Sequence, residues 1–260
     1  MLRLADFDAF FTRGFVRLPG QFSPHEIAAI SMICDRLRHV AEGLGATADV
    51  TQPILWHGAQ FVLGRVPAGA HAGETRIDRI VWAGAAEPEL LDWGADRRLL
   101  EPVAELLGTR DMQHLINQIH YKLPGDGVEF PWHQDSSHRR YGTPEWQDVN
   151  GRGSYVQAVT AIDACGLDNG PLLFVENSCQ YGHVAVGEDG ELPRELLEPQ
   201  RIVAVELDPG DVVLFGPYTI HGSSPNTSNR SRRLFINGYA HPLANTRVYP
   251  GEGAGRFLRV

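Results

Sequence analysis

The sequence predicts a mainly β fold with flanking helices, of the sandwich or jelly-roll kind. Helical periodicity is confined to roughly the first 110 residues, whereas short extended stretches follow from Met112 onward. Glycine (28) and proline (17) make up about a sixth of the 260 residues without a fixed period, which indicates many tight turns. Strands and helices do not alternate along the chain, and this disfavours Rossmann and TIM-barrel architectures.

Length and composition fit a single domain over residues 1–260, with a helical part over about 1–110 and a β core over about 111–245. Hydrophobic residues are 43% of the chain and charged residues 21%, so a sizeable core is expected rather than disorder. The net charge of −9 argues against a nucleic acid or an anionic membrane as the partner.

Three observations favour the cytoplasm. No apolar run approaches the ~20 residues needed to cross a bilayer, and the first six residues lack the layout of a signal peptide. The three cysteines, Cys34, Cys165 and Cys179, have irregular spacing and form no CxxC motif. A disulfide framework or a thiolate zinc site is therefore not expected.

The N-terminal part predicts a strand or turn and then two helices. Residues 10–18 are rich in Phe and Val and are expected to enter the fold as a strand or turn. Residues 23–26 (Ser-Pro-His-Glu) form a capping box, and apolar residues at helical spacing follow until Gly43 and Gly45, which are expected to end that helix. A second helix is predicted over about 88–107, ended by Gly108.

The remaining chain predicts short strands separated by polar turns such as Asp-Asn-Gly-Pro at 168–171 and Asp-Pro-Gly-Asp at 208–211. The expected strands are 115–122, 154–162, 171–175, 202–207, 212–215 and 233–239.

The candidate chemistry begins at residues 132–135 (Trp-His-Gln-Asp). On a strand, His133 and Asp135 would point to one face and could bind one metal together. A turn and an apolar strand at 210–220 lead to His221, which is placed to supply a third ligand. Two histidines and one carboxylate suit non-haem Fe(II) oxygenases, although the same set can hold zinc. Eleven residues further on, Arg232 could hold a ligand carboxylate in a bidentate fashion.

These motifs, in this order, resemble the phytanoyl-CoA dioxygenase family, which includes ectoine hydroxylase and many bacterial small-molecule hydroxylases. The resemblance is carried by residues 14–20 (Gly-Phe-Val-Arg-Leu-Pro-Gly), 23–26, 121–125 (Tyr-Lys-Leu-Pro-Gly), 132–135, 168–172 (Asp-Asn-Gly-Pro-Leu), 221–223 (His-Gly-Ser) and Arg232. It implies a double-stranded β-helix (jelly roll, cupin-like), an Fe(II) cofactor, and 2-oxoglutarate and O₂ as co-substrates. One departure is that residues 176–179 (Glu-Asn-Ser-Cys) stand where the family usually has Pro-Gly-Ser-His.

The resemblance also implies roles for individual residues. His133, Asp135 and His221 take the metal-ligand positions, and no catalytic residue is expected beyond them. Arg232 takes the position that grips the distal carboxylate of 2-oxoglutarate, and Ser223 the position of a supporting hydroxyl. The co-substrate is also expected to contact Gln118, and by strand alternation Lys122 and His120 share its face, with His120 assigned to the substrate.

The implied reaction hydroxylates a small polar metabolite, such as an amino acid or a biosynthetic intermediate, and releases succinate and CO₂. A carboxylate at position 135 argues for hydroxylation, or desaturation, over halogenation. The long connection 136–153 carries Arg139 and Arg140 directly after the metal motif. It is interpreted as a lid whose arginines meet an anionic group such as a carboxylate, phosphonate or phosphate, with a solvated surface loop as the equal alternative.

Two other functions remain open at this point. One is a zinc-dependent hydrolase, and the other is a non-catalytic jelly-roll binding module. Arg232 and Ser223 favour the oxygenase, because a hydrolase has no need of a clamp for 2-oxoglutarate. The pattern points to no particular oligomeric state.

Overall fold

The computed structural model describes residues 2–69, 71–187, 189–249 and 255–260. Its helices are α1 (Leu4–Thr12), α2 (Pro24–Thr47), α3 (Glu89–Gly94), α4 (Arg97–Leu107) and α5 (Asp135–His138), with 3₁₀ turns η1 (Ala83–Ala85), η2 (Ser178–Tyr181), η3 (Arg194–Leu196) and η4 (Pro199–Arg201). Its strands are β1 (Phe15–Leu18), β2 (Ile54–Trp56), β3 (Ala59–Arg65), β4 (Thr75–Val81), β5 (Asp111–Lys122), β6 (Phe130–His133), β7 (Tyr155–Ala161), β8 (Leu172–Val175), β9 (Ile202–Val205), β10 (Val212–Phe215), β11 (His221–Ser223), β12 (Arg232–Ala240) and β13 (Arg256–Arg259).

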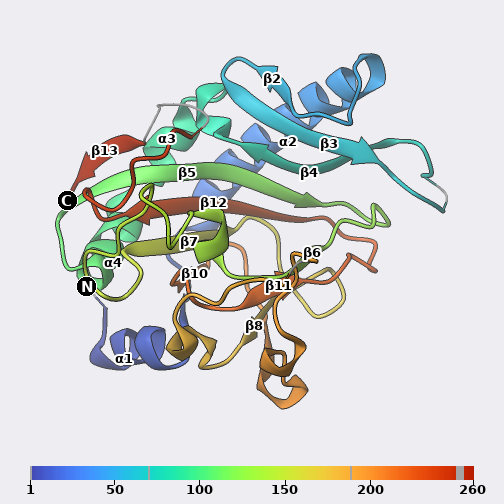
Figure 1. The fold of residues 1–260 in the computed structure, drawn as a ribbon. Coiled ribbons are helices and arrows are strands. Elements are labelled where there is room, and N and C mark those ends of the chain that lie inside the picture. The colour runs from blue at the N-terminus through green and yellow to red at the C-terminus, as the bar shows by residue number, and fades with distance from the viewer. Residues whose placement is uncertain (1, 70, 188, 250–254) are drawn as a thin grey trace.

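The strands form two antiparallel sheets, as Figure 1 shows. The large sheet has the order β1-β10-β7-β12-β5-β4-β3-β2, with β13 also paired to β5, and the small sheet has the order β6-β11-β8-β9. Two facing antiparallel sheets with helices outside them confirm the predicted jelly-roll class.

The two faces of the large sheet have different neighbours because side chains alternate along each strand. One face packs on α2 and α4 in a core that includes Ile119 and Phe235. The other face turns Leu234 and Ile236 toward the small sheet, where Phe174 of β8 joins the same cluster. Residues that share a face with Leu234 therefore lie between the two sheets, which is where a buried ligand site can form.

The helical predictions need three corrections. Phe10 lies in α1 rather than in a strand, which begins only at Phe15. Helix α2 does start at the predicted capping box but runs through both glycines to Thr47. A Cβ atom at Gly45 would stand 2.4 Å from the side chain of Thr75, so this glycine allows α2 to pack closely on β4 instead of ending the helix.

The second predicted helix is divided into α3 and α4. Asp96 caps α4 by accepting a hydrogen bond from the Arg98 N–H at 2.8 Å, and it ends the run of helical residues that precedes it. Gly108 ends α4 in the left-handed conformation, as predicted.

The part of the chain before residue 111 is less helical than predicted, because it also contributes β1, β2, β3 and β4 to the large sheet. The later strands lie where they were expected, but the short strands β6 and β11 and the last strand β13 were missed. Within the described residues, no helix combines the length and the apolar character needed to cross a membrane.

Candidate active site

A cavity of about 780 Å³ lies between the two sheets. Its floor is the inner face of the large sheet, with lining residues on β4, β5, β7 and β12, and β6, β11 and α5 line the opposite side. Among the described residues, five buried polar atoms that have no hydrogen-bond partner belong to the lining: His120 Nε2, Asp135 Oδ2, Ser137 Oγ, Arg139 Nε and Tyr249 Oη. Unsatisfied buried polar atoms are rare in proteins, so their concentration here marks a place built for a ligand.

His133, Asp135 and His221 converge in this cavity. His133 ends β6 and His221 begins β11, and the two residues are paired across these antiparallel strands. Their rings are 4.2 Å apart between centroids. Each of the three residues offers one ligand atom, and these atoms all lie within 4.8 Å of one another.

Asp135 reaches this cluster by a different route from the one predicted. It does not share a strand with His133; it is the first residue of the short helix α5. Gln134, between the two, still has extended backbone angles and is the N-cap residue of α5. The strand-to-helix turn brings imidazole and carboxylate together, where a plain strand alternation had been expected.

The imidazoles are held in the orientation that a metal requires. Nδ1 of His133 donates to the carbonyl of Pro131 at 2.7 Å, and Nδ1 of His221 donates to the carbonyl of Thr219 at 2.9 Å. A carbonyl can only accept, so in the neutral rings Nε2 carries the free lone pair. Burial, with the neighbouring His133, lowers the pKa of His221 to about 3, which keeps this ring neutral.

Asp135 is buried and is held in its ionised form. Burial by itself would raise the pKa of this carboxyl, but His221 and Arg139 nearby outweigh that effect and lower it below its usual value. Its Oδ2 has no hydrogen-bond partner among the described residues. Two neutral imidazoles and one ionised carboxylate with a free oxygen fit a ferrous ion.

Gln134 is a supporting residue that sequence reasoning missed. Its buried amide donates to the carbonyls of Gly182 at 2.9 Å and Tyr218 at 2.6 Å, and its oxygen accepts from the Val184 N–H at 2.8 Å. These bonds fasten the turn between His133 and Asp135 to two neighbouring loops. The only sequence sign of this role is a polar amide between the two candidate ligands.

Arg232, at the start of β12, is buried on the floor of the cavity. Its Nε and Nη2 donate to the carbonyl of Gly170 at 3.0 and 2.7 Å. None of the described carboxylates forms an ion pair with it, and burial lowers its pKa to about 10. A buried guanidinium without a carboxylate partner favours an anionic ligand.

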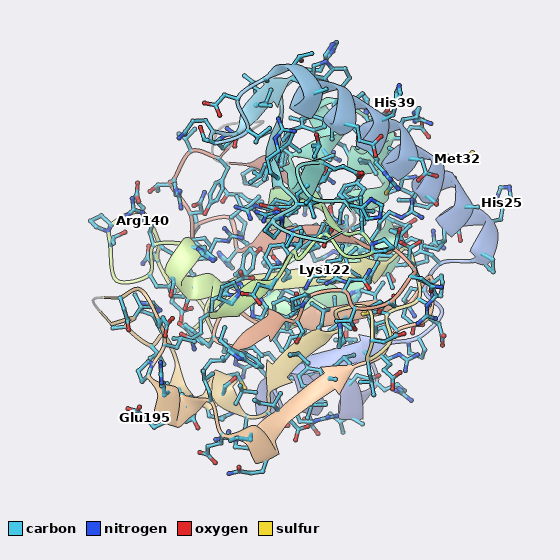
Figure 2. All side chains as sticks on the ribbon, turned by 90° about the vertical axis from the view of Figure 1, so that its right-hand side faces the viewer. His25, Met32, His39, Lys122, Arg140 and Glu195 are labelled. Carbon is cyan, nitrogen blue, oxygen red and sulfur yellow. The ribbon has the colours of Figure 1, made fainter. Side chains whose placement is uncertain are left out.

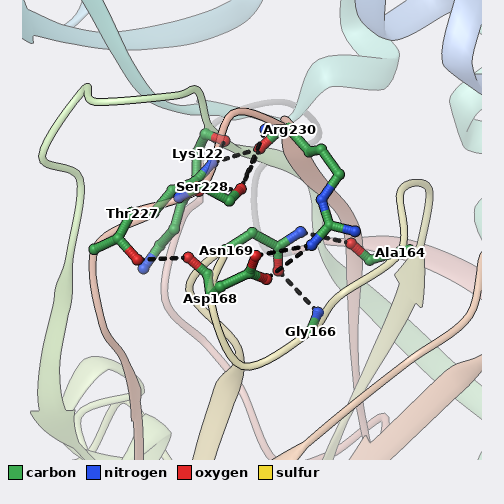
Figure 3. Close-up of polar contacts among 9 residues, drawn as sticks. Lys122, Ala164, Gly166, Asp168, Asn169, Thr227, Ser228 and Arg230 are labelled. Carbon is green, nitrogen blue, oxygen red and sulfur yellow. Dashed lines mark hydrogen bonds and ion pairs between the residues drawn. The ribbon is translucent and has the colours of Figure 1, made fainter.

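Gly170, which orients this guanidinium, belongs to a tightly held turn (Figure 3). Asp168 forms an ion pair with Arg230 at 2.8 Å, and the carbonyl of Asp168 accepts from Thr227. Asn169 donates to the carbonyl of Ala164 at 2.7 Å. The predicted Asp-Asn-Gly-Pro turn thus links the small sheet to the loop that precedes β12.

We expect Gly170→Ala to destabilise the protein by about 2 kcal/mol or more, because φ is +80° at this position and a Cβ atom would stand 2.5 Å from the Ser224 carbonyl oxygen. Urea denaturation measures the free energy of unfolding. Gly151→Ala is the matched control, since its φ is +66° with nothing within 4 Å of the added carbon. Equal losses in the two variants would show that the contact with Ser224 is unimportant.

The other residues expected to contact the co-substrate differ in position. Gln118 and Ser223 line the cavity. Lys122 is fully buried but is not among the lining residues; its ammonium donates to the carbonyls of Ser223 and Ser224, and burial followed by the charge of Arg232 lowers its pKa to about 7. The structure therefore supports Lys122 as a prop for the strand end that carries Ser223 rather than as a direct contact.

His120 lines the cavity on β5 and stacks on Phe130, with ring centroids 4.5 Å apart. Burial holds its pKa well below the usual value, and the charge of Arg79 acts in the same direction. The ring is therefore neutral, and its Nε2 is one of the unpartnered atoms described above.

The connection 136–153 is anchored rather than free. Tyr141 and Trp146 are buried and stack on each other. Arg139 is also buried, and its Nη2 donates to the Tyr155 hydroxyl at 3.0 Å. Arg140 is exposed, extends from the edge of the molecule in Figure 2, and lies 3.4 Å from Glu145. Both arginines line the cavity, but they occupy its inner wall and its rim respectively.

The departure at residues 176–179 leaves the metal cluster supported. Ser178 is buried, and its hydroxyl accepts from the Ile220 N–H at 2.8 Å, one residue before His221. Cys179 donates instead to carbonyls at the end of α1. The altered residue thus contacts the N-terminal helix and not the cavity.

Comparison with known proteins agrees with this geometry. The profile of the phytanoyl-CoA dioxygenase family (PhyH) matches residues 10–234. A 2-aminoethylphosphonate dioxygenase from an uncultured bacterium is 30% identical over 53% of this chain and 48% of its own length. The ectoine dioxygenase of Sphingopyxis alaskensis is 26% identical over 84% of this chain and 69% of its own length. The crystal structure of EvdO2 from Micromonospora carbonacea, complexed with 2-oxoglutarate, superposes with a TM-score of 0.67 at 22% identity, covering 97% of this chain and 96% of that one.

Proposed function

Because this chain belongs to the phytanoyl-CoA dioxygenase family, we propose that it is an Fe(II)- and 2-oxoglutarate-dependent dioxygenase that hydroxylates a small polar molecule. The chain spans about half the length of the first curated relatives it matches. The activity proposed here therefore rests on the residues of this chain and not on those names.

The observation that carries the proposal is the joint lining of one cavity by two kinds of residue. His133, Asp135 and His221 present a metal-ligand set, and Arg232 presents a buried cation without a carboxylate partner among the described residues. A zinc hydrolase would need only the first set. A keto-diacid needs both, since one end must reach the metal and the other must be neutralised.

Bound together, ferrous iron, 2-oxoglutarate and O₂ supply the oxidising power for hydroxylation of a C–H bond, with release of succinate and CO₂. The protein groups position these reactants. Arg232, fixed by Gly170, holds the distal carboxylate of 2-oxoglutarate, with Ser223 and Gln118 beside it. Apolar side chains of Leu234, Ile236 and Val159 form the walls and keep bulk water from the reacting centre.

The charge of the lining supports an anionic substrate. Five arginines line the cavity, whereas Asp135 is the only acidic residue among the described lining residues. Two relatives are named as enzymes of phosphonates, which are anions, and a third as an ectoine dioxygenase. We propose a small organic anion as the substrate, and neither a nucleic acid nor a membrane as a partner.

We also propose a cytoplasmic location. In the described chain Cys34, Cys165 and Cys179 are all free thiols, which suits a reducing compartment.

The test is a measurement of 2-oxoglutarate turnover. Purified protein with Fe(II), 2-oxoglutarate and O₂ should convert the keto-acid to succinate and CO₂, slowly alone and faster with a substrate found by screening small anions. Protein loaded with Zn(II) should form no succinate. Succinate formation that is independent of iron, or its absence under all conditions, would contradict the proposed function.

A further inference from the structure

Arg79 is a residue of the cavity that no motif indicated. It lies on β4, within a strand of sequence Thr-Arg-Ile-Asp-Arg-Ile-Val, and its half-buried side chain lines the cavity floor. Its strand neighbours Arg76 and Asp78 are engaged with each other, at 2.7 Å between Nε and Oδ1. Arg79 does not share in that pair.

The five arginines of the lining differ in what they contact. Arg232 is bonded to Gly170, Arg139 to Tyr155 and Arg247 to the carbonyl of His138 at 2.7 Å, and Arg140 is near Glu145. Arg79 has no hydrogen bond or ion pair with any residue of the described chain. Its cost of burial is thus not offset by a protein group, which is the condition under which a ligand anion binds well.

His120 completes the feature. It is the Cα partner of Arg79 across β4 and β5, so both side chains project from the same face of the sheet into the cavity. The unpartnered Nε2 of His120 lies beside the unpartnered guanidinium. A guanidinium fork next to an imidazole nitrogen offers several N–H donors to the oxygens of one anion.

This feature is separate from the proposed clamp for 2-oxoglutarate. Arg232 is on β12 and Arg79 is on β4, with β5 between them. Neighbouring strands are about 4.8 Å apart, so the two strands are roughly 10 Å apart across the sheet. Arg232 is also paired with Lys122 and Arg79 with His120, two residues apart along β5. One small carboxylate does not satisfy both arginines.

We propose that Arg79 and His120 form a second oxyanion site, which holds a phosphonate or carboxylate group of the substrate on the β4 side of the cavity. The inference rests on the proposed function, because it places the substrate in the same cavity as iron and 2-oxoglutarate. It names the chemical class of the substrate and the residue that selects it.

The test uses the anaerobic protein saturated with Fe(II) and 2-oxoglutarate, so that the metal and Arg232 are already occupied. Methylphosphonate and acetate are titrated separately by calorimetry as the two probe anions. The wild-type protein is expected to bind at least one of them, and Arg79→Gln to weaken that binding by about tenfold to a hundredfold, the usual cost of a lost charge-assisted hydrogen bond. The affinity for 2-oxoglutarate should stay within about twofold in the variant. The stronger of the two probes identifies the anion class.

Arg76→Gln is the matched control, since it removes one arginine from the same strand without touching the cavity lining. It should leave the affinity for both probes unchanged. Binding of neither probe by the wild-type protein, equal binding by Arg79→Gln, or a loss of 2-oxoglutarate affinity in that variant would each overturn the inference. Should Arg79→Gln fail to fold, Arg79→Lys is judged by the same comparisons. Failure of the wild-type protein to bind iron with 2-oxoglutarate would instead count against the proposed function.

Discussion

Replacement of Asp135 by alanine is expected to abolish both turnover and iron retention. Asp135 supplies the only carboxylate of the candidate ligand set, and without it two neutral imidazoles would face the ion alone. Loss of a mere supporting partner weakens metal affinity about ten- to a hundredfold, so loss of a ligand should exceed about a hundredfold. Equilibrium dialysis against Fe(II) measures the affinity, and succinate release measures the turnover.

His133→Ala should behave in the same way, because both side chains are ligands in this account. Asp148→Ala is a suitable control, since Asp148 accepts hydrogen bonds from Tyr218 at 2.9 Å and from Gly153 but is not part of the cavity lining. It should retain iron. Succinate formation at the wild-type rate in Asp135→Ala or His133→Ala would refute the assignment of these ligands.

Arg232→Lys is expected to raise the apparent KM for 2-oxoglutarate by about tenfold to a hundredfold. A lysine keeps the positive charge but cannot bind Gly170 and a carboxylate at once with a planar fork. Steady-state kinetics with varied 2-oxoglutarate measures the effect.

The neighbouring residue gives a matched control. Arg233 points to the other face of β12 and forms an ion pair with Asp163 at 2.7 Å. Arg233→Lys should leave the KM for 2-oxoglutarate nearly unchanged even if it lowers stability. Equal effects of the two substitutions would mean that the KM responds to strand stability and not to a carboxylate clamp.

The fold was predictable where local pattern and tertiary environment agree. The buried strand β7 has an apolar run between polar turns, and it was found within one or two residues. Strand β4 was missed because Arg76, Asp78 and Arg79 give it a polar appearance, although it lies inside the large sheet. Its polarity comes from an ion pair on one face and from a cavity on the other, and neither is visible in a local window.

The site was predictable in its members more than in its geometry. The motif spacing named His133, Asp135, His221 and Arg232, and the structure brings all four to one cavity. The strand-to-helix turn at Asp135 was not foreseen, because a single residue of helix start does not alter an H-x-D pattern. The role of Gln134 depends on loops about 50 and 84 residues away in the chain, so no short motif could reveal it.

The most direct test of the account is a titration of the protein with Fe(II) and 2-oxoglutarate in the absence of O₂. Chelation of the keto-acid to a ferrous ion that His133, Asp135 and His221 hold should give a weak visible charge-transfer band, and the band should require both additions. A band that fails to form, or one that persists in Asp135→Ala, would contradict the central claim.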